Sequence, residues 1–568
     1  MKRYIFLVSA LLSGSLLTGC AEDFLEVKPV VQKTDQNYYS TPEEAQEALV
    51  GCYDGLQGLS GDLIFLAPEI ASDDCSGSEG SADEDNYNQI NTLTDMSIQY
   101  PDFFNEAWSA YYKLLNRCNT LIQKIDQISG WSDEGEKLSI LAQARFIRAY
   151  AYFDLVRSFG HCPLLVEPSN DIIPCSEYKE IYTQIFEDFK FAAQNGSEGD
   201  YDGHATKYSA AGLLARAYLF YTGYYGEEAP NVTKSEVISF LEDVKGELMS
   251  NPYKLWPAAA QQKAKKENGD FHECYSSPAS DYGYAGELNK EVLFSIRYTY
   301  TGAYGGSEND GNLFSLYVSP RGGKGGGTEG LSDKDLQKNG WASGWGIACA
   351  SKEIFDSFEA GDMRKEASII DIKNEISASF DTKTADGSSQ YTSYSIKKYC
   401  TTGDFDDNGD YNYSCLINNS SGHMNLSQTQ DFIVLRYADV LLMLSELKED
   451  VEGMNKVHER ATGVANYYTA YDKEKLFQER QWELCFEGIR YWDMLRYDGR
   501  QGDFAYAKKC LAGPQGNGVY KLINAGVEDD VTVDYNRLSK TKGLFHIPLN
   551  QITISGGAIT QNEGYKKK

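Results

Sequence analysis

Apolar residues recur three or four positions apart through most of the first half of the chain, which predicts amphipathic helices. Thr41-Pro42-Glu43-Glu44 combines a capping hydroxyl, a proline at the first helical position and two acids near the positive end of the helix dipole. These four residues predict the start of a helix that runs to about Tyr53. The same spacing predicts further helices over residues 103–128, 134–159, 178–193, 207–224, 435–448 and 473–497.

Two of these predicted helices carry related sequences. Arg148-Ala149-Tyr150 recurs 68 residues later as Arg216-Ala217-Tyr218. The separation is twice the period of about 34 residues that is typical of tetratricopeptide helix pairs, in which small residues let helices approach closely. The pattern predicts a mainly α fold built on a tetratricopeptide-like scaffold of helical hairpins.

The residue composition and the spacing of apolar residues change after about residue 255. Residues 258–345 are rich in Gly, Ser and Tyr and contain only brief strand-like runs, such as Val292–Ile296. We therefore expect a long, irregular, aromatic-rich excursion with short strands. The predicted organisation is a leader over residues 1–19, a helical region over 20–255, and a region over 256–568 that holds the excursion and the closing helices.

The first twenty residues resemble a bacterial lipoprotein leader. Lys2 and Arg3 precede an apolar stretch, and Leu17-Thr18-Gly19-Cys20 is similar to the motif at which such leaders are cleaved. The prediction is a signal peptide over residues 1–19 and a lipidated, palmitate-bearing Cys20 that anchors the chain. A plain signal peptide that happens to contain a cysteine is the alternative.

Charge and composition limit the classes of ligand and partner that the chain is expected to bind. The chain has 53 Lys plus Arg against 83 Asp plus Glu, a formal charge of −30, which disfavours a nucleic-acid partner. Its 41 Tyr and 7 Trp suit surfaces that bind polar ligands with apolar faces. Beyond Cys20 there are eleven cysteines, of which Cys162 with Cys175, or Cys400 with Cys415, could close a disulfide.

The sequence offers no catalytic signature and one weak metal motif. It contains no His-Glu-x-x-His, Gly-x-Ser-x-Gly or Walker loop, so no catalytic residue is predicted. Glu483 and Glu487, one turn apart, are expected to pair with Arg490 along one helix. Four residues match the first half of a calcium loop whose bidentate twelfth ligand is missing, so either bound calcium or a solvated acidic turn fits them. They are Asp404, Asp406, Asn408 and Asp410.

Several colinear motifs resemble the RagB/SusD family of Bacteroidetes surface lipoproteins. They are Cys20-Ala21-Glu22-Asp23-Phe24-Leu25-Glu26, Ala144–Val156 followed by Phe159-Gly160 and Pro163, Glu479-Arg480, Glu483-Leu484, Phe486-Glu487-Gly488, Arg490–Arg496, Ile547-Pro548, and Gln561–Tyr565. The resemblance implies a lipoprotein, anchored in the outer membrane and facing the cell exterior, that captures a glycan without transforming it. It also implies a partner, a SusC-like TonB-dependent transporter, and no required cofactor.

The resemblance further implies that two loop regions, residues 73–100 and 275–345, supply the ligand-binding side chains. Aromatic rings stack on the C–H faces of sugars, and polar groups bind the hydroxyls. Trp108 is assigned to the core because of its helical spacing. An oligopeptide-binding lid, a surface glycoside hydrolase and a lid without a site of its own stay open as alternatives. The candidate contacts are Asp73, Asn86, Tyr87, Tyr282, Tyr284, Tyr304, Trp341 and Trp345.

Overall fold

The computed structural model describes most of the chain from Tyr38 onward. The described residues are 38–59, 61–77, 85–198, 203–250, 266–267, 270–271, 291–298, 312–321, 331–378, 390–401, 403–405, 408–413, 431–524 and 527–566. The leader, Cys20, Tyr282, Tyr284, Tyr304, Asp406 and Cys415 lie outside them. Among the described residues, no helix has the length and apolar character needed to cross a membrane.

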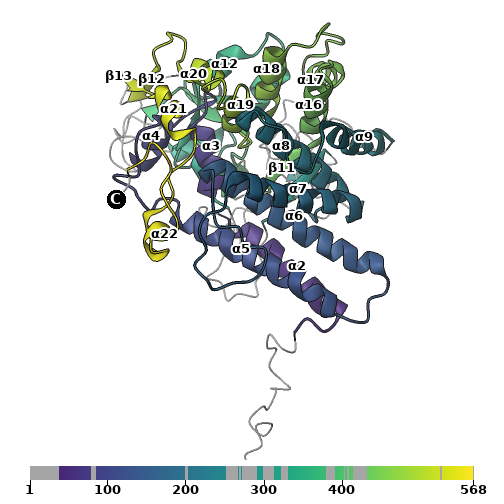
Figure 1. Cartoon of the computed structure of the whole chain (residues 1–568). Helices are drawn as coiled ribbons and strands as arrows, with labels where there is room; N and C mark the ends of the chain where they lie inside the picture. Colours follow the sequence, from purple (N-terminus) through teal and green to yellow (C-terminus); the bar gives the residue numbers. More distant parts are fainter. Residues whose placement is uncertain are drawn as a thin grey trace, which may run out of the picture.

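Long helices stack side by side in the first half of the chain (Figure 1). Each one contacts the next along the sequence, and α2 also contacts α6, as expected of a series of helical hairpins. The prediction of a mainly helical first half is confirmed. These helices are α2 (Pro42–Gln57), α5 (Asn105–Lys124), α6 (Glu134–Phe159), α7 (Tyr178–Asn195), α8 (Lys207–Tyr225) and α9 (Lys234–Ser250).

Local sequence signals set the ends of these helices. The Thr41 hydroxyl accepts a hydrogen bond from the Glu44 amide at the start of α2, as its sequence predicts. Thr206 and Ser209 form a reciprocal capping box at the start of α8. Helix α6 ends at Gly160, whose φ of 74° places it in the left-handed region that favours glycine.

The closing helices of the second half pack directly on the first half. α16 contacts α8 and α9, and α19 contacts α8. The closing helices are α16 (Tyr437–Lys448), α17 (Glu452–Thr462), α18 (Lys473–Leu484), α19 (Arg490–Arg496), α20 (Ala505–Leu511), α21 (Leu538–Thr541) and α22 (Leu549–Ile554).

The prediction of one helix over residues 473–497 is wrong. α18 ends at Leu484, and α19 begins only at Arg490. Between them Phe486 and Gly488 have φ values of 61° and 72°, which a continuing α-helix does not allow. The Gly488 amide instead donates a hydrogen bond to the Glu69 carboxylate. Likewise, residues before Tyr437 form a strand, not the start of the helix predicted from residue 435.

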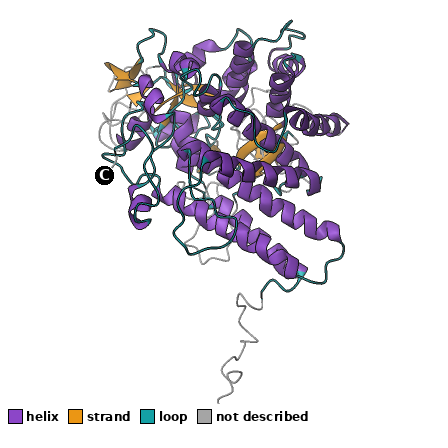
Figure 2. Cartoon of the chain, in the orientation of Figure 1, coloured by secondary structure: helices purple, strands orange, loops and turns teal. Residues whose placement is uncertain are grey.

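Strands form small sheets among the helices, as Figure 2 shows. The largest is antiparallel, in the order β1-β5-β8-β6, and β4 pairs with β11. The strands are β1 (Cys75–Gly77), β2 (Lys266–Glu267), β3 (Asp270–Phe271), β4 (Val292–Ile296), β5 (Ala348–Ala350), β6 (Ile369–Asp371), β7 (Gln390–Tyr391), β8 (Tyr394–Ile396), β9 (Gly403–Phe405), β10 (Tyr411–Tyr413), β11 (Phe432–Arg436), β12 (Val519–Asn524) and β13 (Val527–Thr532).

The remaining elements are short helices and single helical turns. They are η2 (Asp62–Leu66), α3 (Ala67–Ile70), α4 (Asp85–Asn91), η3 (Ile125–Gln127), α10 (Phe314–Val318), α11 (Asp333–Lys338), α12 (Lys352–Ser357), α13 (Met363–Ser368), α14 (Ile372–Glu375) and η7 (Tyr535–Arg537).

Much of the tyrosine content serves the core, and only part of it is available for binding. Trp108 is 3% exposed, as its helical spacing predicts. Seven tyrosines are almost fully buried, and several pack edge-to-face with other rings, as Tyr182 does with Tyr221. These seven, each less than 2% exposed, are Tyr111, Tyr152, Tyr182, Tyr221, Tyr224, Tyr399 and Tyr491.

A buried ion-pair network joins the closing helices to the rest of the molecule. Arg436, at the end of β11, donates to the carboxylates of Glu483 and Glu487 at 2.6 and 2.8 Å. Arg364 donates to Glu479 at 2.6 Å. The expectation that Glu483 and Glu487 pair with Arg490 along one helix is therefore wrong, because their partners come from elements distant in the sequence.

Other ion pairs join neighbouring helices or lie within one helix, as expected of a scaffold. Arg148 donates to Asp188 at 2.8 Å, and Arg157 pairs with Asp154 on the same helix. Arg496 donates to Asp493 at 2.7 Å, three residues before it.

Candidate functional site

The predicted loop region over 73–100 pairs, through β1, with β5, which begins three residues beyond the predicted region over 275–345. Cys75 of β1 lies opposite Ala350 of β5 in the antiparallel register. Ser351 strengthens the junction, because its amide donates to the Asp74 carbonyl at 2.8 Å and its hydroxyl donates to the Asp73 carbonyl at 2.7 Å. The segment that begins at Asp73 and the segment that ends at Ala350 therefore lie side by side.

Trp345 is the exposed ring of this region. It is 36% exposed and is the only exposed tryptophan among the described residues. Its amide donates to the Leu316 carbonyl at 2.6 Å, and its ring centroid lies 6.2 Å from that of the buried Tyr317. At Gly344 an added Cβ would lie 2.6 Å from the Leu316 carbonyl oxygen, so the backbone here lies tight against α10. The fixed backbone presents the indole to solvent.

A second exposed ring lies on the adjacent hairpin. Phe405 of β9 is 43% exposed and packs edge-to-face on Tyr411 of β10, with centroids 5.1 Å apart. The Tyr411 hydroxyl donates to the Trp341 carbonyl at 3.3 Å, and the Gly403 amide donates to the Gly340 carbonyl at 3.1 Å. We call Tyr317, Trp345, Phe405 and Tyr411 the aromatic edge. Phe405 is not among the contacts predicted from the sequence, although an aromatic residue flanked by acids in a polar loop is a usable signal.

Asp73 is not free to bind a ligand in this structure. Its two carboxylate oxygens accept from Nε and Nη2 of Arg490 at 2.6 and 2.8 Å. A third bond, 3.3 Å long, comes from the Gln481 amide. The expectation that Asp73 stands on an exposed loop is wrong, because its carboxylate is hydrogen-bonded to Arg490 of α19 and Gln481 of α18.

Tyr87 and Trp341 are also buried, contrary to the expectation of exposed loops. Tyr87 lies in helix α4, is 6% exposed, and donates its hydroxyl to Asp62 at 2.9 Å. Trp341 is 2% exposed and lies beneath the β9–β10 hairpin. Asn86, one residue before Tyr87 in α4, is half-buried.

Two buried carboxyl groups lie directly beneath this region. Burial, and then the neighbouring Asp74, raises the pKa of Glu69 to about 8. Burial, and then Asp73, raises the pKa of Asp74 above its ordinary range. A raised pKa suits a general acid, but both side chains are completely buried. They act on the stability of the region and do not reach a ligand.

The calcium and disulfide predictions find little support in the described residues. Asn408 and Asp410 are exposed at the turn between β9 and β10, while Asp404 belongs to β9. The described part of the chain contains no group of three or more His, Cys, Asp or Glu residues placed to hold a metal. Bound calcium stays a prediction. Cys162 and Cys175 are free thiols in this structure, so the prediction of a disulfide between them is wrong. The predicted pairing of Cys400 with Cys415 stays a prediction, because Cys415 lies outside the described residues.

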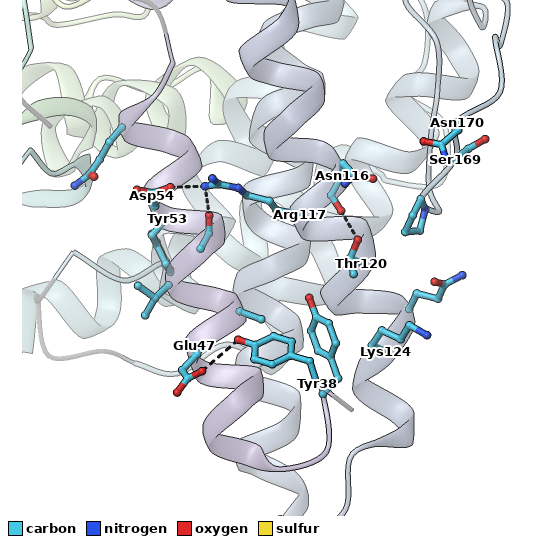
Figure 3. A pocket seen from close by; sticks show the side chains of 17 residues that line it. Tyr38, Glu47, Tyr53, Asp54, Asn116, Arg117, Thr120, Lys124, Ser169 and Asn170 are labelled. Carbon is cyan, nitrogen blue, oxygen red and sulfur yellow. Dashed lines mark hydrogen bonds and ion pairs between the residues drawn. The ribbon is translucent and has the colours of Figure 1, made fainter. Parts of the chain in front are cut away.

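A large groove lies elsewhere, along the exposed side of α2 and α5 (Figure 3). Its volume is about 1110 Å³. The Arg117 guanidinium crosses between the two helices, donating to the Gly51 carbonyl at 2.7 Å and pairing with Asp54. The sequence analysis did not predict this groove. The other lining residues are Tyr38, Tyr39, Glu47, Ala48, Val50, Tyr53, Gln57, Asn116, Thr120, Gln123, Lys124, Pro168, Ser169 and Asn170.

Two family models match the chain in succession. Residues 290–565 match the model described as the SusD family. Residues 23–219 match the model described as "Starch-binding associating with outer membrane". Between them the matches include β1, β5, the aromatic edge and both helices of the groove.

Individual relatives resemble the chain over most of its length. SusD-like protein P38 of Formosa agariphila is 24% identical over 522 residues, which cover 86% of this chain and 90% of that protein. The structure of surface glycan-binding protein A from Bacteroides fluxus has a TM-score of 0.67 at 21% identity, covering 93% of this chain and all of that one. The corresponding protein of Bacteroides thetaiotaomicron, in complex with laminarihexaose, has a TM-score of 0.66 at 19% identity, with coverage of 93% and 100%. The shared fold agrees with the predicted tetratricopeptide-like scaffold.

Proposed function

Because the chain belongs to the SusD family, we propose that it captures a glycan at the cell surface. The family is non-catalytic, and the chain is not an enzyme. The relative solved with laminarihexaose supports a carbohydrate ligand, and the family description supports association with the outer membrane. Which glycan is bound depends on the shape of the loops around the site.

We place the site at Trp345 because its indole is exposed to solvent. A pyranose ring has C–H groups on its faces, which pack on an aromatic surface, and hydroxyls on its rim. Trp345 offers such a surface on a backbone held tight against α10, so little side-chain or loop ordering is needed when the ligand binds. Phe405 supplies a second flat surface on the adjacent hairpin.

The proposed role includes handing the ligand on unchanged. Cys20 carries the lipid that holds the chain to the outer membrane, and the captured glycan passes to a SusC-like TonB-dependent transporter. Stacking and hydrogen bonds alone give an affinity whose dissociation rate suits such transfer. The lipoprotein leader in the sequence and the description of the second family model support this part of the proposal.

Affinity electrophoresis tests the site. The purified protein runs through gels that contain laminarin, starch, xylan or mannan, and at least one of these is expected to retard it. Trp345→Ala is expected to weaken the retardation several-fold to tenfold, because an aromatic stacking contact contributes about 0.5–1.5 kcal/mol beyond the area that it buries. Phe405→Ala is expected to have a smaller effect, because its ring stands on a short two-stranded hairpin and is smaller than an indole.

Trp131→Ala is the matched control. Trp131 is a partly exposed tryptophan in the loop before α6, away from the aromatic edge. Retardation that survives Trp345→Ala unchanged would contradict this site. Binding of peptides but of no polysaccharide would favour an oligopeptide ligand instead, and shortened polysaccharide would favour a hydrolase.

A further inference from the structure

We propose that the groove between α2 and α5 is a second carbohydrate site, which takes a neutral oligosaccharide independently of the aromatic edge. The inference rests on the proposed function, since it assumes that this chain meets glycans. Its volume of about 1110 Å³ is at the upper end of the range for small-molecule sites, so it can hold several sugar units. It is lined by α2, α5, the residues before α2 and the loop at Pro168–Asn170 (Figure 3).

Unpaired hydrogen-bonding groups gather on the α5 wall. Asn116, Thr120, Gln123 and Lys124 follow one another at spacings that place them on one face of a helix. Within the described part of the chain, the side-chain amides of Asn116 and Gln123 and the Lys124 ammonium have no hydrogen-bond partner. Such groups, facing one hollow, match the hydroxyl rim of a sugar.

Two further groups of the same kind come from the loop after Pro168 and from α5 itself. Asn170 reaches the groove from the loop after Pro168, and its amide also lacks a partner among the described residues. Arg117 is fixed in place through Nη1, which donates to the Gly51 carbonyl, while its Nε and Nη2 have no acceptor in the described chain. The guanidinium is therefore already oriented before a ligand arrives.

The charges in the groove balance, which selects a neutral ligand. Glu47 and Asp54 line one side, and Arg117 and Lys124 line the other. Arg117 and Asp54 already pair with each other, and both side chains are nearly half exposed. A phosphate, an acidic peptide or a basic peptide would gain little net attraction in such a field.

Gly51 leaves open space where the helix would otherwise carry a side chain. A Cβ added at Gly51 would meet nothing within 4 Å, so packing does not require glycine here. A glycine inside a helix costs about 1 kcal/mol relative to alanine. The absence of a side chain keeps the groove open and lets a ligand approach the backbone of α2.

Two tyrosines complete the groove with aromatic faces. Tyr38 and Tyr39 pack edge-to-face, with ring centroids 4.7 Å apart, and both are half-buried. The Tyr38 hydroxyl donates to Glu47 of α2 at 3.4 Å, which holds its ring against the groove (Figure 3). Rings of this kind stack on sugar faces, while amides around them bind hydroxyls.

Native mass spectrometry counts the sites. The mature protein is mixed separately with laminarihexaose, cellohexaose, maltohexaose and mannohexaose. Two bound hexasaccharides per chain are expected with at least one of them. Gly51→Leu extends a side chain from a position where a Cβ meets nothing within 4 Å, and it is expected to reduce the count to one, as is Trp345→Ala. The double variant is expected to bind none.

Matched variants separate blocking from unfolding. Gly51→Ala strengthens the helix but adds only one methyl group, so it is expected to keep at least part of the groove binding. Lys124→Ala is expected to weaken the groove site several-fold, whereas Lys113→Ala, on the same helix but outside the groove, leaves it unchanged. Circular dichroism of each variant confirms folding.

Three results would overturn the inference. One hexasaccharide per chain, lost in Trp345→Ala and retained in Gly51→Leu, would leave the proposed function standing and remove the second site. A Gly51→Leu variant that keeps both hexasaccharides but no longer co-purifies with a transporter would assign the groove to a protein partner. No binding of any hexasaccharide by the unaltered chain would reject both proposals for these ligands.

Discussion

At the scale of single residues, position within the fold decides what each side chain does. Trp341 and Trp345 are four residues apart in an irregular segment, yet one is 2% exposed and the other 36%. Nothing in the sequence separates them, because an irregular segment has no period from which a buried face can be predicted. The sequence alone likewise suggests that Asp73 is a binding residue. In the structure both of its carboxylate oxygens accept hydrogen bonds from Arg490, more than 400 positions away.

The buried Glu69 makes stability depend on pH. Its pKa is about 8 in the folded chain against an ordinary value of 4.5, so folding favours the protonated form. This contribution is complete below about pH 4.5 and is lost as the pH rises through 8. In contrast, burial alone would raise the pKa of Glu483, but Arg460 and Arg436 hold it below its usual range. The stabilisation from the ionised Glu483 is present above the ordinary pKa of a glutamate and is lost as the pH falls below it.

We therefore expect the thermal midpoint to be highest near pH 5 and to fall toward pH 8. Glu69→Gln keeps an acceptor for the Gly488 amide and removes the titrating proton, so the decline between pH 5 and 8 is expected to flatten. Thermal unfolding followed by circular dichroism at several pH values measures the thermal midpoint of each variant. Glu106→Gln, an exposed acid on α5, serves as the control. A Glu69→Gln profile that parallels that of the unaltered chain would contradict the assignment.

At the scale of elements, the sequence predicts helices well and their interruptions poorly. The helices at 134–159 and 207–225 have recognisable caps, and their predicted bounds agree with the structure to within one residue. The break between α18 and α19 is hidden because apolar and charged residues keep a helical spacing across it. Its cause is tertiary, since Glu69 and the partners of Glu483 and Glu487 come from other elements.

Gly488 is the residue that the break requires. Its φ is 72°, and a Cβ there would lie 2.9 Å from the Ile64 carbonyl oxygen. Gly488→Ala is expected to destabilise the fold by about 2 kcal/mol or more, through left-handed strain plus the clash. Gly463→Ala is the matched control, because Gly463 has a φ of 75° with nothing within 4 Å.

That control is expected to cost only about 1 kcal/mol, from strain alone. Urea unfolding monitored by tryptophan fluorescence measures both values. Equal costs for the two variants would mean that the close approach of Ile64 does not constrain the break.

At the scale of the whole molecule, a stacked helical scaffold carries two separate candidate binding surfaces. One is the aromatic edge, and the other is the groove between α2 and α5. Tyr317 and Trp345 of the aromatic edge belong to the irregular excursion to which the family resemblance points, whereas Phe405 and Tyr411 come from the later β9–β10 hairpin. The groove belongs to α2 and α5, whose exposed polar residues look like ordinary solvated faces until both helices are placed together. The sequence does contain two separate signals for it, the helical Gly51 in α2 and the polar residues at helical spacing in α5.

The central claim is that the chain binds a glycan and releases it unaltered. Equilibrium dialysis of the mature protein against each polysaccharide, followed by sizing of the recovered carbohydrate, tests it most directly. We predict that at least one polysaccharide concentrates on the protein side and is recovered at its original length. Carbohydrate that is recovered shortened, or that distributes equally across the membrane for every polysaccharide tried, would contradict the account.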